Sequence, residues 1–439
     1  MQRPFNIASG DFETLCRVVS CRSANKKMTF YVLRDLNQNT LQALLFQKLV
    51  IPDESVVHVK GSLVVVEGRI KSNDTTIKSH ELHLTDINVV SESFVLPIQI
   101  SELNHAITEN DTTIGHSTRL DNRTVDLRSK QNQAIFRIKS SFVQHMSNFL
   151  WDANFIQIHT PKLTSVSSEG GAEVFRTEYF DKRAFLVQSP QLYKQMCINS
   201  DFHQVFEIAP VFRAENSRDS RHLCEFTGVD IEMVTSDYRQ FLQVVWTMLR
   251  HTFFETCRTN SDLIRVANPE FSGIIIPETI VSMSHMCAID LLRQNGYPEI
   301  GTYDDLKNEH EILIGKLVLE KHQSDLVVVE EYPKDLRPFY TMPCPGDSQY
   351  SMSYDILFRG QEVLSGSQRQ HNYSDLVAAA TTRGVNTNAI EFYLASFKYG
   401  VFPHAGGGFG LERLVSKFLE LSSIQYASLY PRTPNRLAP

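Results

Sequence analysis

The chain has 439 residues, of which 42% are hydrophobic and 21% are charged, and its formal net charge is −7 at pH 7. These values exclude a mainly disordered chain, because they leave enough apolar material for a large core. No run reaches the ~18 apolar residues that a membrane-spanning helix needs, so we expect no membrane partner. The length predicts roughly two to three domains.

The seven cysteines are scattered and include no C-x-x-C pair. This pattern argues against a disulfide framework or a structural zinc site. We also find no apolar targeting segment at the start of the sequence. Together these features predict a protein of a reducing compartment, the cytoplasm.

The first 95 residues predict a small β-barrel. Alternating or β-branched runs over 29–34, 63–70 and 82–90 indicate strands, and a short helix is expected over 40–48. This combination suits a Greek-key barrel such as an OB-fold. Residues 1–50 carry seven Lys or Arg against three Asp or Glu. Such a surface would attract a polyanion, although charge alone is explained as well by a solvated face without a partner.

Polar residues 96–130 predict a linker before a second domain. Apolar residues at helical spacing between Ile135 and Phe149 predict one long amphipathic helix. The elements expected after it are strands over 155–159, 205–214 and 226–233, helices over 236–257 and 303–322, and a Gly-rich stretch that leads into a final helix after Gly410.

Several common catalytic motifs are absent from the sequence. We find no G-x-x-x-x-G-K-[ST], no H-E-x-x-H and no G-x-S-x-G. The glycines at 406–410 do not satisfy G-x-G-x-x-G and lack a βαβ context. The sequence therefore argues against four classes of protein: P-loop nucleotide-binding proteins, zinc proteases, α/β-hydrolases and Rossmann-type dinucleotide-binding proteins.

A predicted hairpin carries the first candidate cluster. Arg213 and Glu215 are two apart on a strand and share a face, as do Asp230 and Glu232 on the returning strand. An arginine offers a fork for a phosphate or a carboxylate, and Phe226 offers a flat platform for a base. A surface hairpin with ordinary ion pairs would explain the same residues.

Acidic residues mark a second cluster. Asp355 and Glu362 provide oxygens of the type that hold Mg²⁺ beside phosphates, and Ser365 and Arg369 follow closely enough to orient a small anion. An exposed acidic strand and loop is the simpler alternative.

Two further clusters combine a helix with polar groups. The Gly406–Gly410 stretch precedes a helix bearing Arg413, which suits a phosphate. Gln191 and Lys194 share a helix face, where a buried lysine would need an anion. Simple strand-to-helix packing and an amphipathic turn remain open for these two clusters.

In this order the clusters resemble the three motifs of the class II aminoacyl-tRNA synthetases. Motif 1 matches the 135–150 helix that leads to Pro161, motif 2 matches 212–226 and motif 3 matches 408–413. Within the class, nearly the whole chain closely resembles the aspartyl-tRNA synthetases of archaeal and eukaryotic cytosolic type. The most specific stretches are 119–128, 168–171, 188–195, 364–369 and 431–439.

The resemblance implies an α+β fold with two domains. Residues 1–95 would form an OB-fold anticodon-binding barrel and 96–130 a linker or hinge. Residues 131–439 would form the class II catalytic domain, an antiparallel sheet flanked by helices. Its motifs would span 131–163, 205–234 and 403–421. Motif 1 builds the dimer in this class, so the resemblance also implies a homodimer with Pro161 at the interface.

The resemblance further implies ATP-dependent activation of L-aspartate and its transfer to the terminal adenosine of tRNA(Asp), with ATP and Mg²⁺ as cofactors. Catalysis would depend on positioning and on charge stabilisation at the α-phosphate. The implied aspartate-binding residues are Glu169, Gln191, Lys194, Arg213, Asp230, Ser365 and Arg369. The implied ATP-binding residues are Arg213, Glu215, Arg221, His222, Leu223, Phe226, Glu362, Gly410, Leu411, Glu412 and Arg413. The implied metal ligands are Asp355, Glu362 and Ser365, and the implied anticodon-binding residues are Phe30, Gln42 and Glu81.

Three alternatives share parts of this pattern. Asparaginyl-tRNA synthetases keep the arginine but lack the lysine at position 194, so Lys194 favours aspartate. An ammonia-dependent asparagine synthetase would need no anticodon-reading barrel. A catalytically inactive synthetase that serves as an RNA-binding module is disfavoured by intact Arg213, Glu362 and Arg413. Whether tRNA(Asn) is also charged stays open.

Overall fold

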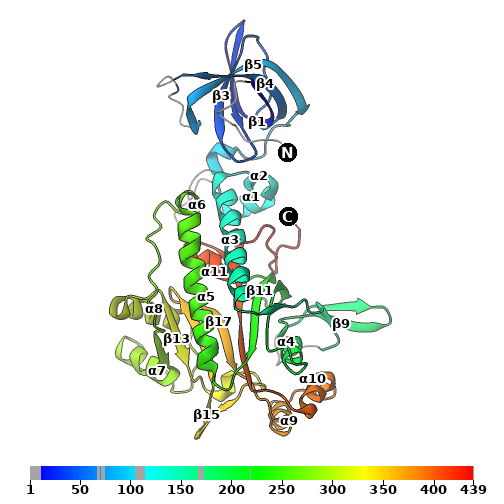
Figure 1. Ribbon diagram of the computed structural model, residues 1–439, viewed down its shortest axis with the longest axis vertical. Coiled ribbons are helices and arrows are strands. Elements are labelled where there is room, and N and C mark those ends of the chain that lie inside the picture. Colours follow the sequence, from blue (N-terminus) through cyan, green and yellow to red (C-terminus); the bar gives the residue numbers. More distant parts are fainter. Residues whose placement is uncertain are drawn as a thin grey trace. The chain divides into compact units, whose positions relative to one another are not determined.

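The computed structural model describes residues 11–66, 70, 75–103, 114–166, 173–217 and 219–438. The chain divides into two compact units, one up to Gln99 and one from Ile100 onward (Figure 1). Each unit has its own sheet and its own hydrophobic core, and each is described by itself below.

The first unit is a closed barrel of five strands in the order β1-β2-β3-β5-β4. The strands are β1 (Asp11–Asn25), β2 (Met28–Arg34), β3 (Thr40–Leu45), β4 (Val56–Val65) and β5 (Ile77–Ser91). Neighbouring strands are antiparallel except β3 and β5, which are parallel. Alternate side chains fill the interior, among them Tyr31, Leu33, Val57, Val59 and Leu82. Among the described residues of this unit, closure leaves no long free strand edge.

The prediction of a helix over 40–48 was wrong. Strand β3 occupies Thr40–Leu45, with β2 paired along one edge and β5 along the other. Leucine, glutamine and alanine favour a helix when the local sequence alone is considered. Pairing on both edges and burial of Leu41 and Ala43 in the barrel outweigh that preference.

The second unit is built on a sheet of eight strands in the order β12-β13-β16-β17-β18-β11-β10-β6, which gives the chain an α+β fold. The strands are β6 (Ile156–Gln157), β10 (Gln204–Phe212), β11 (Glu225–Val234), β12 (Ser282–Ser284), β13 (Leu326–Glu330), β16 (Ser353–Phe358), β17 (Gln361–Gln368) and β18 (His404–Gly410). The six central strands are antiparallel, and only the edge strands β6 and β12 are parallel to their neighbours. The strand expected over 155–159 is reduced to the short β6.

Two long helices pack against this sheet, α3 (Lys130–Asp152) and α5 (Tyr238–Thr259) (Figure 1). Aromatic rings fill the space between helices and sheet, as in the stacked pair Phe253 and Phe358, whose centroids are 4.9 Å apart. The Asp237 side chain caps α5, one residue later than the Ser236 start that the sequence suggested.

Shorter elements complete the second unit. The remaining α-helices are α1 (His116–Asp121), α2 (Arg123–Asp126), α4 (Gln191–Ile198), α6 (Ser261–Ala267), α7 (His285–Gln294), α8 (Asn308–His322), α9 (Tyr373–Thr382), α10 (Glu391–Ser396) and α11 (Leu411–Phe418). The 3₁₀ turns are Ile100–Leu103, Lys334–Leu336, Phe397–Tyr399 and Ile424–Ala427. The small sheets contain β7 (Leu163–Thr164), β8 (Arg176–Tyr179), β9 (Lys182–Leu186), β14 (Pro343–Cys344) and β15 (Asp347–Ser351). Helix α8 begins at Asn308, five residues after the predicted 303.

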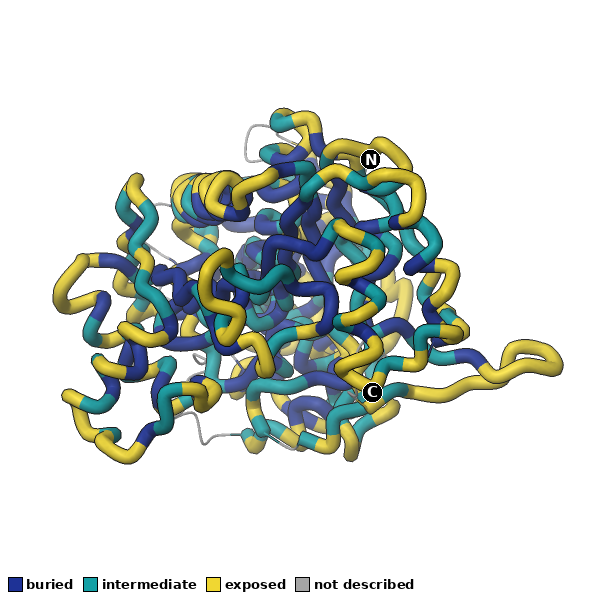
Figure 2. Tube along the Cα trace, turned by 90° about the horizontal axis from the view of Figure 1, so that it is seen from below, coloured by how far each residue is buried: buried dark blue, intermediate teal, exposed yellow. Residues whose placement is uncertain are grey.

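Buried segments gather in the interior of the second unit, whereas β8 is exposed throughout and its hairpin with β9 projects from the surface (Figure 2). None of the helices in the described ranges combines the length and the apolar character that a bilayer span requires.

Candidate active site

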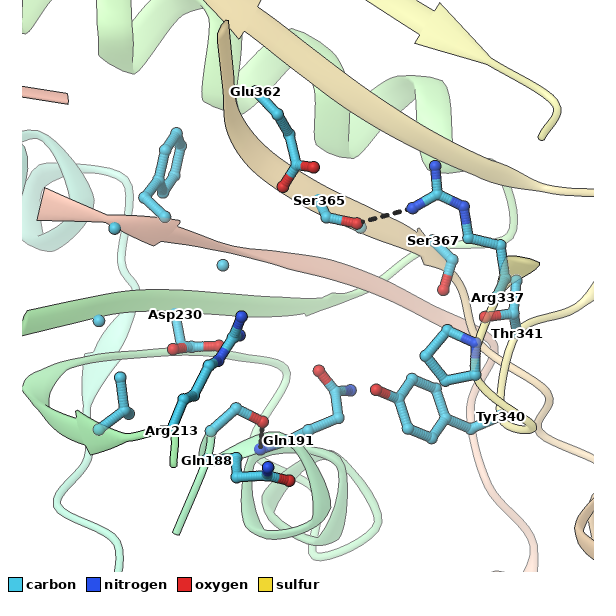
Figure 3. Close-up of a pocket in the computed structure, with 18 of the residues that line it drawn as sticks. Gln188, Gln191, Arg213, Asp230, Arg337, Tyr340, Thr341, Glu362, Ser365 and Ser367 are labelled. Carbon is cyan, nitrogen blue, oxygen red and sulfur yellow. Dashed lines mark hydrogen bonds between the residues drawn. The ribbon is translucent and has the colours of Figure 1, made fainter. Parts of the chain in front are cut away.

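A cavity of about 950 Å³ lies in the second unit and collects most of the sequence-predicted site residues (Figure 3). The predicted residues that line it are Gln191, Arg213, Glu215, Arg221, His222, Leu223, Phe226, Asp230, Glu362, Ser365, Arg369, Gly410, Glu412 and Arg413. Lys194 and Asp355 are buried beside it, and Leu411 belongs to the hydrophobic core. Glu169 lies outside the described residues.

Alternation along β11 builds the cavity floor. Val229 and Ile231 point into the helical core, whereas Asp230 and Glu232 point to the opposite face. Strand β18 runs beside β11 and pairs Gly408 with Asp230 and Gly406 with Glu232. A Cβ atom at Gly408 would lie only 2.8 Å from Asp230 Oδ1. The glycine-rich stretch, predicted to approach a phosphate, is thus a strand whose missing side chains leave room for two carboxylates.

Lys194 and Arg369, both predicted to bind aspartate, meet at this floor. Lys194 Nζ donates to Asp230 Oδ1 at 3.0 Å and lies 3.3 Å from Glu232 Oε2. Arg369 donates to both oxygens of Glu232, at 2.8 and 3.1 Å, and to Gln191 Oε1 at 3.2 Å. Helix α4 supplies Lys194 and Gln191 from one face, as their spacing predicted. Segments distant in sequence therefore place both cations on one carboxylate.

Charge balance explains how these groups stay ionised in the interior. Burial by itself would raise the pKa of Glu232, but the Arg369 and Lys194 cations hold that pKa below its ordinary value. Two cations and two carboxylates make the cluster formally neutral. His404 lies next to it, and burial lowers the pKa of this imidazole to about 4, so it adds no charge at neutral pH.

A second region of the cavity combines aromatic and guanidinium groups. The Arg213 guanidinium carbon lies 5.4 Å from the Phe226 ring centroid, and Arg213 Nη1 lies 3.9 Å from Glu215 Oε1. The sequence had suggested that Arg213 and Glu215 lie on a strand. Strand β10 ends at Phe212, so both residues lie in the segment that follows it. A Cβ atom at Gly410 would lie 3.7 Å from Arg413 Cβ and 3.9 Å from Phe226 Cδ2. Phe226 and Arg413 therefore both lie close to this glycine.

The loop of the predicted hairpin is held by Asp219. Its carboxylate accepts from the Arg221 amide at 2.9 Å and pairs with His222 Nδ1 at 2.7 Å. Burial would raise the pKa of Asp219, but these hydrogen bonds lower it to about 2. Glu412 is likewise held in place by the protein itself. Its carboxylate accepts from the Thr227 amide at 2.9 Å and from Lys139 Nζ at 2.6 Å.

Asp355, Glu362 and Ser365 form an acidic corner of the cavity, and their arrangement depends on a β-bulge. Ile356 pairs with Leu364 but Leu357 pairs with Glu362, so Val363 is an extra residue in β17. Glu362 and Ser365 are three apart and would lie on opposite faces of a regular strand. The bulge turns both toward the cavity, as Figure 3 shows.

The corner has uneven charge compensation. Arg337 donates to both oxygens of Asp355, at 2.9 and 2.6 Å, and to Ser365 Oγ at 2.9 Å. Burial, and next the Asp355 carboxylate, raise the pKa of Glu362 to about 7, while Arg413 acts in the opposite direction. Glu362 is thus the member of this corner with too little positive charge around it.

These residues fit a divalent cation only if the ion brings other ligands. In the described part of the chain, no group of three or more His, Cys, Asp or Glu side chains is arranged to hold a metal ion. Mg²⁺ is commonly held by one or two carboxylates together with phosphate oxygens and water. Glu362 and the Ser365 hydroxyl suit that role, whereas Asp355 would first have to share its oxygens with Arg337.

Sequence reasoning missed several residues of this cavity. Arg337, Tyr340 and Thr341 come from an irregular segment after β13, and Figure 3 places them along one side. A lone arginine in a segment without periodicity carries no recognisable pattern. Glu311 was also missed: its Oε2 accepts the Glu362 amide at 2.9 Å and so fixes the backbone that carries Glu362.

Helix α8 brings Glu311 there through a close backbone contact, which gives a testable prediction. A Cβ atom at Gly315 would lie 2.5 Å from Gly360 N in the β16–β17 turn. Alanine is worth about 1 kcal/mol more than glycine inside a helix. We nevertheless expect Gly315→Ala to lower the free energy of unfolding by about 1–3 kcal/mol, because the helix must move off the turn. Urea denaturation measures this change.

Gly115→Ala is the control for that substitution, because a Cβ atom at Gly115 would have no neighbour within 4 Å. A Gly315→Ala protein as stable as the wild type would mean that α8 does not contact the turn at this distance.

The predicted anticodon residues lie together in the barrel unit. Phe30 on β2, Gln42 on β3 and Glu81 on β5 come from neighbouring strands. The Arg22 guanidinium carbon lies 5.6 Å from the Phe30 ring centroid. Gln42 donates to Glu81, and Glu81 Oε1 lies 2.9 Å from His83 Nε2. The sequence prediction thus selected adjacent side chains, and their binding role stays a prediction.

Pro161, the predicted interface residue, is exposed just after the edge strand β6. Thr160 anchors the chain before it by donating to both oxygens of Glu207, each at 2.7 Å. The role of Pro161 in a dimer stays a prediction.

Comparison with known proteins gives consistent similarities. Residues 115–434 match the family model of class II tRNA synthetases (D, K and N). The cytoplasmic aspartate–tRNA ligase of Homo sapiens is 39% identical over 435 residues, which cover 95% of this chain and 86% of that protein. A putative aspartyl-tRNA synthetase from Leishmania major Friedlin has a TM-score of 0.89 at 33% identity and covers 98% of this chain and 92% of that one.

An asparaginyl-tRNA synthetase from Pyrococcus horikoshii is also similar in structure, with a TM-score of 0.86 at 27% identity, covering 98% of this chain and 96% of that one. The fold therefore does not separate the two amino-acid specificities. The family match and the extent of the similarity together show that this chain belongs to the class II tRNA synthetases of the D, K and N group.

Proposed function

We propose that the chain is an aspartate–tRNA ligase, which activates L-aspartate with ATP to aspartyl-adenylate and transfers aspartate to the terminal adenosine of tRNA(Asp). The observation that carries this proposal is the convergence of Lys194 and Arg369 on Glu232 at the cavity floor. The similar human protein is named a cytoplasmic aspartate–tRNA ligase, and we propose the cytoplasm for this chain too.

Selection of aspartate follows from charge. Aspartate and asparagine have nearly equal volume but differ by one negative charge, so a site must use cations to prefer aspartate. Arg369 lines the cavity and Lys194 lies directly beneath it. Both oxygens of an aspartate carboxylate can accept hydrogen bonds from these cations, whereas the amide of asparagine would turn an N–H donor toward them, and a site of this kind can discriminate strongly in a single step. Gln191 and Asp230 would orient the rest of the amino acid, and Glu169 would contribute from the 167–172 segment.

ATP would occupy the region around Gly410. We infer that the adenine inserts between Phe226 and Arg413, which both lie close to that glycine, and gains aromatic and cation–π contacts. Glu215 would accept from the adenine amino group. Arg221 and His222, both anchored to Asp219, would hold the outer phosphates.

Arg213 would join the two halves of the reaction, because its guanidinium carbon lies 5.4 Å from the Phe226 ring centroid and its side chain lines the same cavity as Asp230. Its guanidinium can bridge the aspartate α-carboxylate and the ATP α-phosphate, which holds nucleophile and electrophile together. The reaction then needs no covalent enzyme intermediate, and Arg213 stabilises the charge that develops at phosphorus.

A divalent cation, proposed to be Mg²⁺, would be held by Glu362 and Ser365 with phosphate oxygens as further ligands. When bound, it would neutralise phosphate charge. Glu311 would keep the Glu362 backbone in place, and Arg337 would keep Asp355 and Ser365 oriented toward the corner.

We further propose that the first unit is an OB-fold that binds the anticodon, and that the protein acts as a homodimer through the segment containing Pro161. The five-stranded closed barrel and the clustering of Phe30, Gln42 and Glu81 support the anticodon role. Residues 96–130 would serve as the hinge between the two functions.

ATP–pyrophosphate exchange tests the proposed activity directly. We expect aspartate to drive exchange and asparagine to drive it at least 100-fold less well, because Lys194 and Arg369 present hydrogen-bond donors that the amide nitrogen of asparagine cannot accept from. Charging of purified tRNA(Asp) and tRNA(Asn) then shows which nucleic acid accepts the product. Equal exchange with both amino acids would contradict the proposal, and so would exchange with asparagine alone.

A further inference from the structure

The outer surface of the barrel carries aromatic groups beyond the three predicted anticodon residues. Phe30 on β2 pairs with Leu44 on β3, which in turn pairs with His83 on β5. Leu44 is buried but is not a member of the interior cluster of the barrel, which contains Ala43 and Leu45. Gln42 and Leu44 therefore face outward, and Phe46 follows at the next outward position.

Phe46 is exposed by 63% but has a defined support. Its ring meets the His83 ring edge-on, with centroids 5.7 Å apart and planes at 85°. His83 is fixed by Glu81 at 2.9 Å, and Glu81 also accepts from Gln42. A hydrogen-bonded row across β3 and β5 thus holds the histidine that braces the Phe46 ring.

The surface around these rings is basic. The Arg22 guanidinium lies over Phe30, and neither residues 14–34 nor residues 40–52 contain any Asp or Glu. The exposed lysines of this region are Lys26, Lys27 and Lys48. Thr29 Oγ1 donates to Gln47 O at 2.9 Å, which places the β1–β2 turn next to the chain around position 47. Single exposed apolar side chains are common, but aromatic rings framed by cations on a barrel are typical of sites for unpaired bases.

We propose that Phe46, braced by His83, is a second stacking platform that binds an unpaired tRNA base next to the one bound by Phe30. This inference rests on the proposed function and extends it from one recognised base to two. The occupant is RNA rather than a second protein chain, because cations and hydrogen-bonding groups frame the rings.

Three substitutions at position 46 separate stacking from simple apolar contact. Phe46→Leu keeps the apolar character without the ring, Phe46→Ala removes both, and Phe46→Trp keeps a ring. We expect Leu and Ala to raise the KM for tRNA(Asp) in charging about tenfold while Trp stays near wild type, since losing one stacked base costs roughly 5- to 100-fold in affinity. The kcat of charging and the thermal midpoint should stay unchanged.

Leu36→Ala is the matched control, because Leu36 is exposed by the same 63% and belongs to the same barrel. Its KM for tRNA should equal the wild-type value. A Phe46→Leu protein with wild-type KM would overturn the proposal. A Phe46→Ala protein that changes oligomeric state on size-exclusion chromatography while keeping its KM would do so as well, because the platform would then bind a second copy.

A direct readout uses an anticodon stem-loop RNA with 2-aminopurine placed at each loop position in turn. Stacking quenches this fluorophore, so wild type and Phe46→Trp should quench a position that Phe46→Leu does not. Wild-type exchange with aspartate in the absence of tRNA is measured in parallel. If that exchange fails, the proposed function is wrong; if it succeeds and no position depends on Phe46, only the second platform is wrong.

Discussion

Lys194→Met is expected to lower kcat/KM for aspartate in pyrophosphate exchange by about 10²- to 10³-fold and to remove most of the preference over asparagine. Methionine keeps the length and apolar stem of lysine but removes the charge that Asp230 and Glu232 share. Truncating one partner of a buried charge pair in a binding site costs about 2–5 kcal/mol, and the expected range lies within that cost. Exchange assays with each amino acid, together with thermal melting, measure the change.

Lys162→Met provides the control for this substitution. Lys162 also pairs with a buried glutamate, Glu207, at 2.9 Å, but neither residue lines the cavity. We expect that variant to lose stability while keeping the ratio of aspartate to asparagine exchange. A Lys194→Met enzyme with the wild-type ratio would show that the selectivity arises elsewhere.

Glu232→Gln should produce the largest loss of stability, about 3–5 kcal/mol in the free energy of unfolding. The side chain is completely buried and compensates Arg369 and Lys194 at once. Without its charge Arg369 loses its carboxylate partner and Lys194 keeps only Asp230, so a dicarboxylic ligand should restore part of the loss. We expect saturating aspartate to raise the thermal midpoint more in this variant than in wild type.

The stabilisation that ionised Glu232 contributes should also make the free energy of unfolding depend on pH. The pKa of Glu232 is lower in the folded state than in the unfolded chain. Its contribution is therefore complete above the ordinary glutamate pKa of about 4.3 and is lost as pH falls through the folded value. Glu232→Gln should remove this part of the acid sensitivity.

Glu207→Gln is the matched control for Glu232→Gln, because it neutralises a buried carboxylate that bonds Thr160 and Lys162 instead. Aspartate should stabilise that variant no more than wild type. Equal stabilisation of both variants by aspartate would contradict the assignment of the cation pair to substrate binding.

Much of this site could be predicted from the sequence, because its residues recur at the two-residue spacing of a strand or at the three- to four-residue spacing of a helix. Two-residue spacing correctly placed Asp230 and Glu232 together, and helical spacing placed Gln191 with Lys194. Neither rule could place Glu362 with Ser365, because that arrangement depends on the Val363 bulge. A bulge depends on pairing with the next strand, which no local pattern records.

The errors have a related physical cause. The segment at 40–48 was expected to be helical because its local preferences were read without the two strands that pair with residues 40–45. Glu311 was missed because its contribution requires the approach of α8 to the β16–β17 turn. In both cases the deciding contacts join segments that are far apart in sequence.

The pairing of Lys194 with Asp230 has a consequence for how a ligand is received. The ammonium already has an internal carboxylate 3.0 Å away, so it is never a bare charge waiting for an anion. An incoming dicarboxylate must displace or share that resident anion, and part of the attraction is thereby offset. Under the proposed function, this offset favours moderate affinity and ready release over tight capture, which suits a site that must hand its ligand on in every cycle.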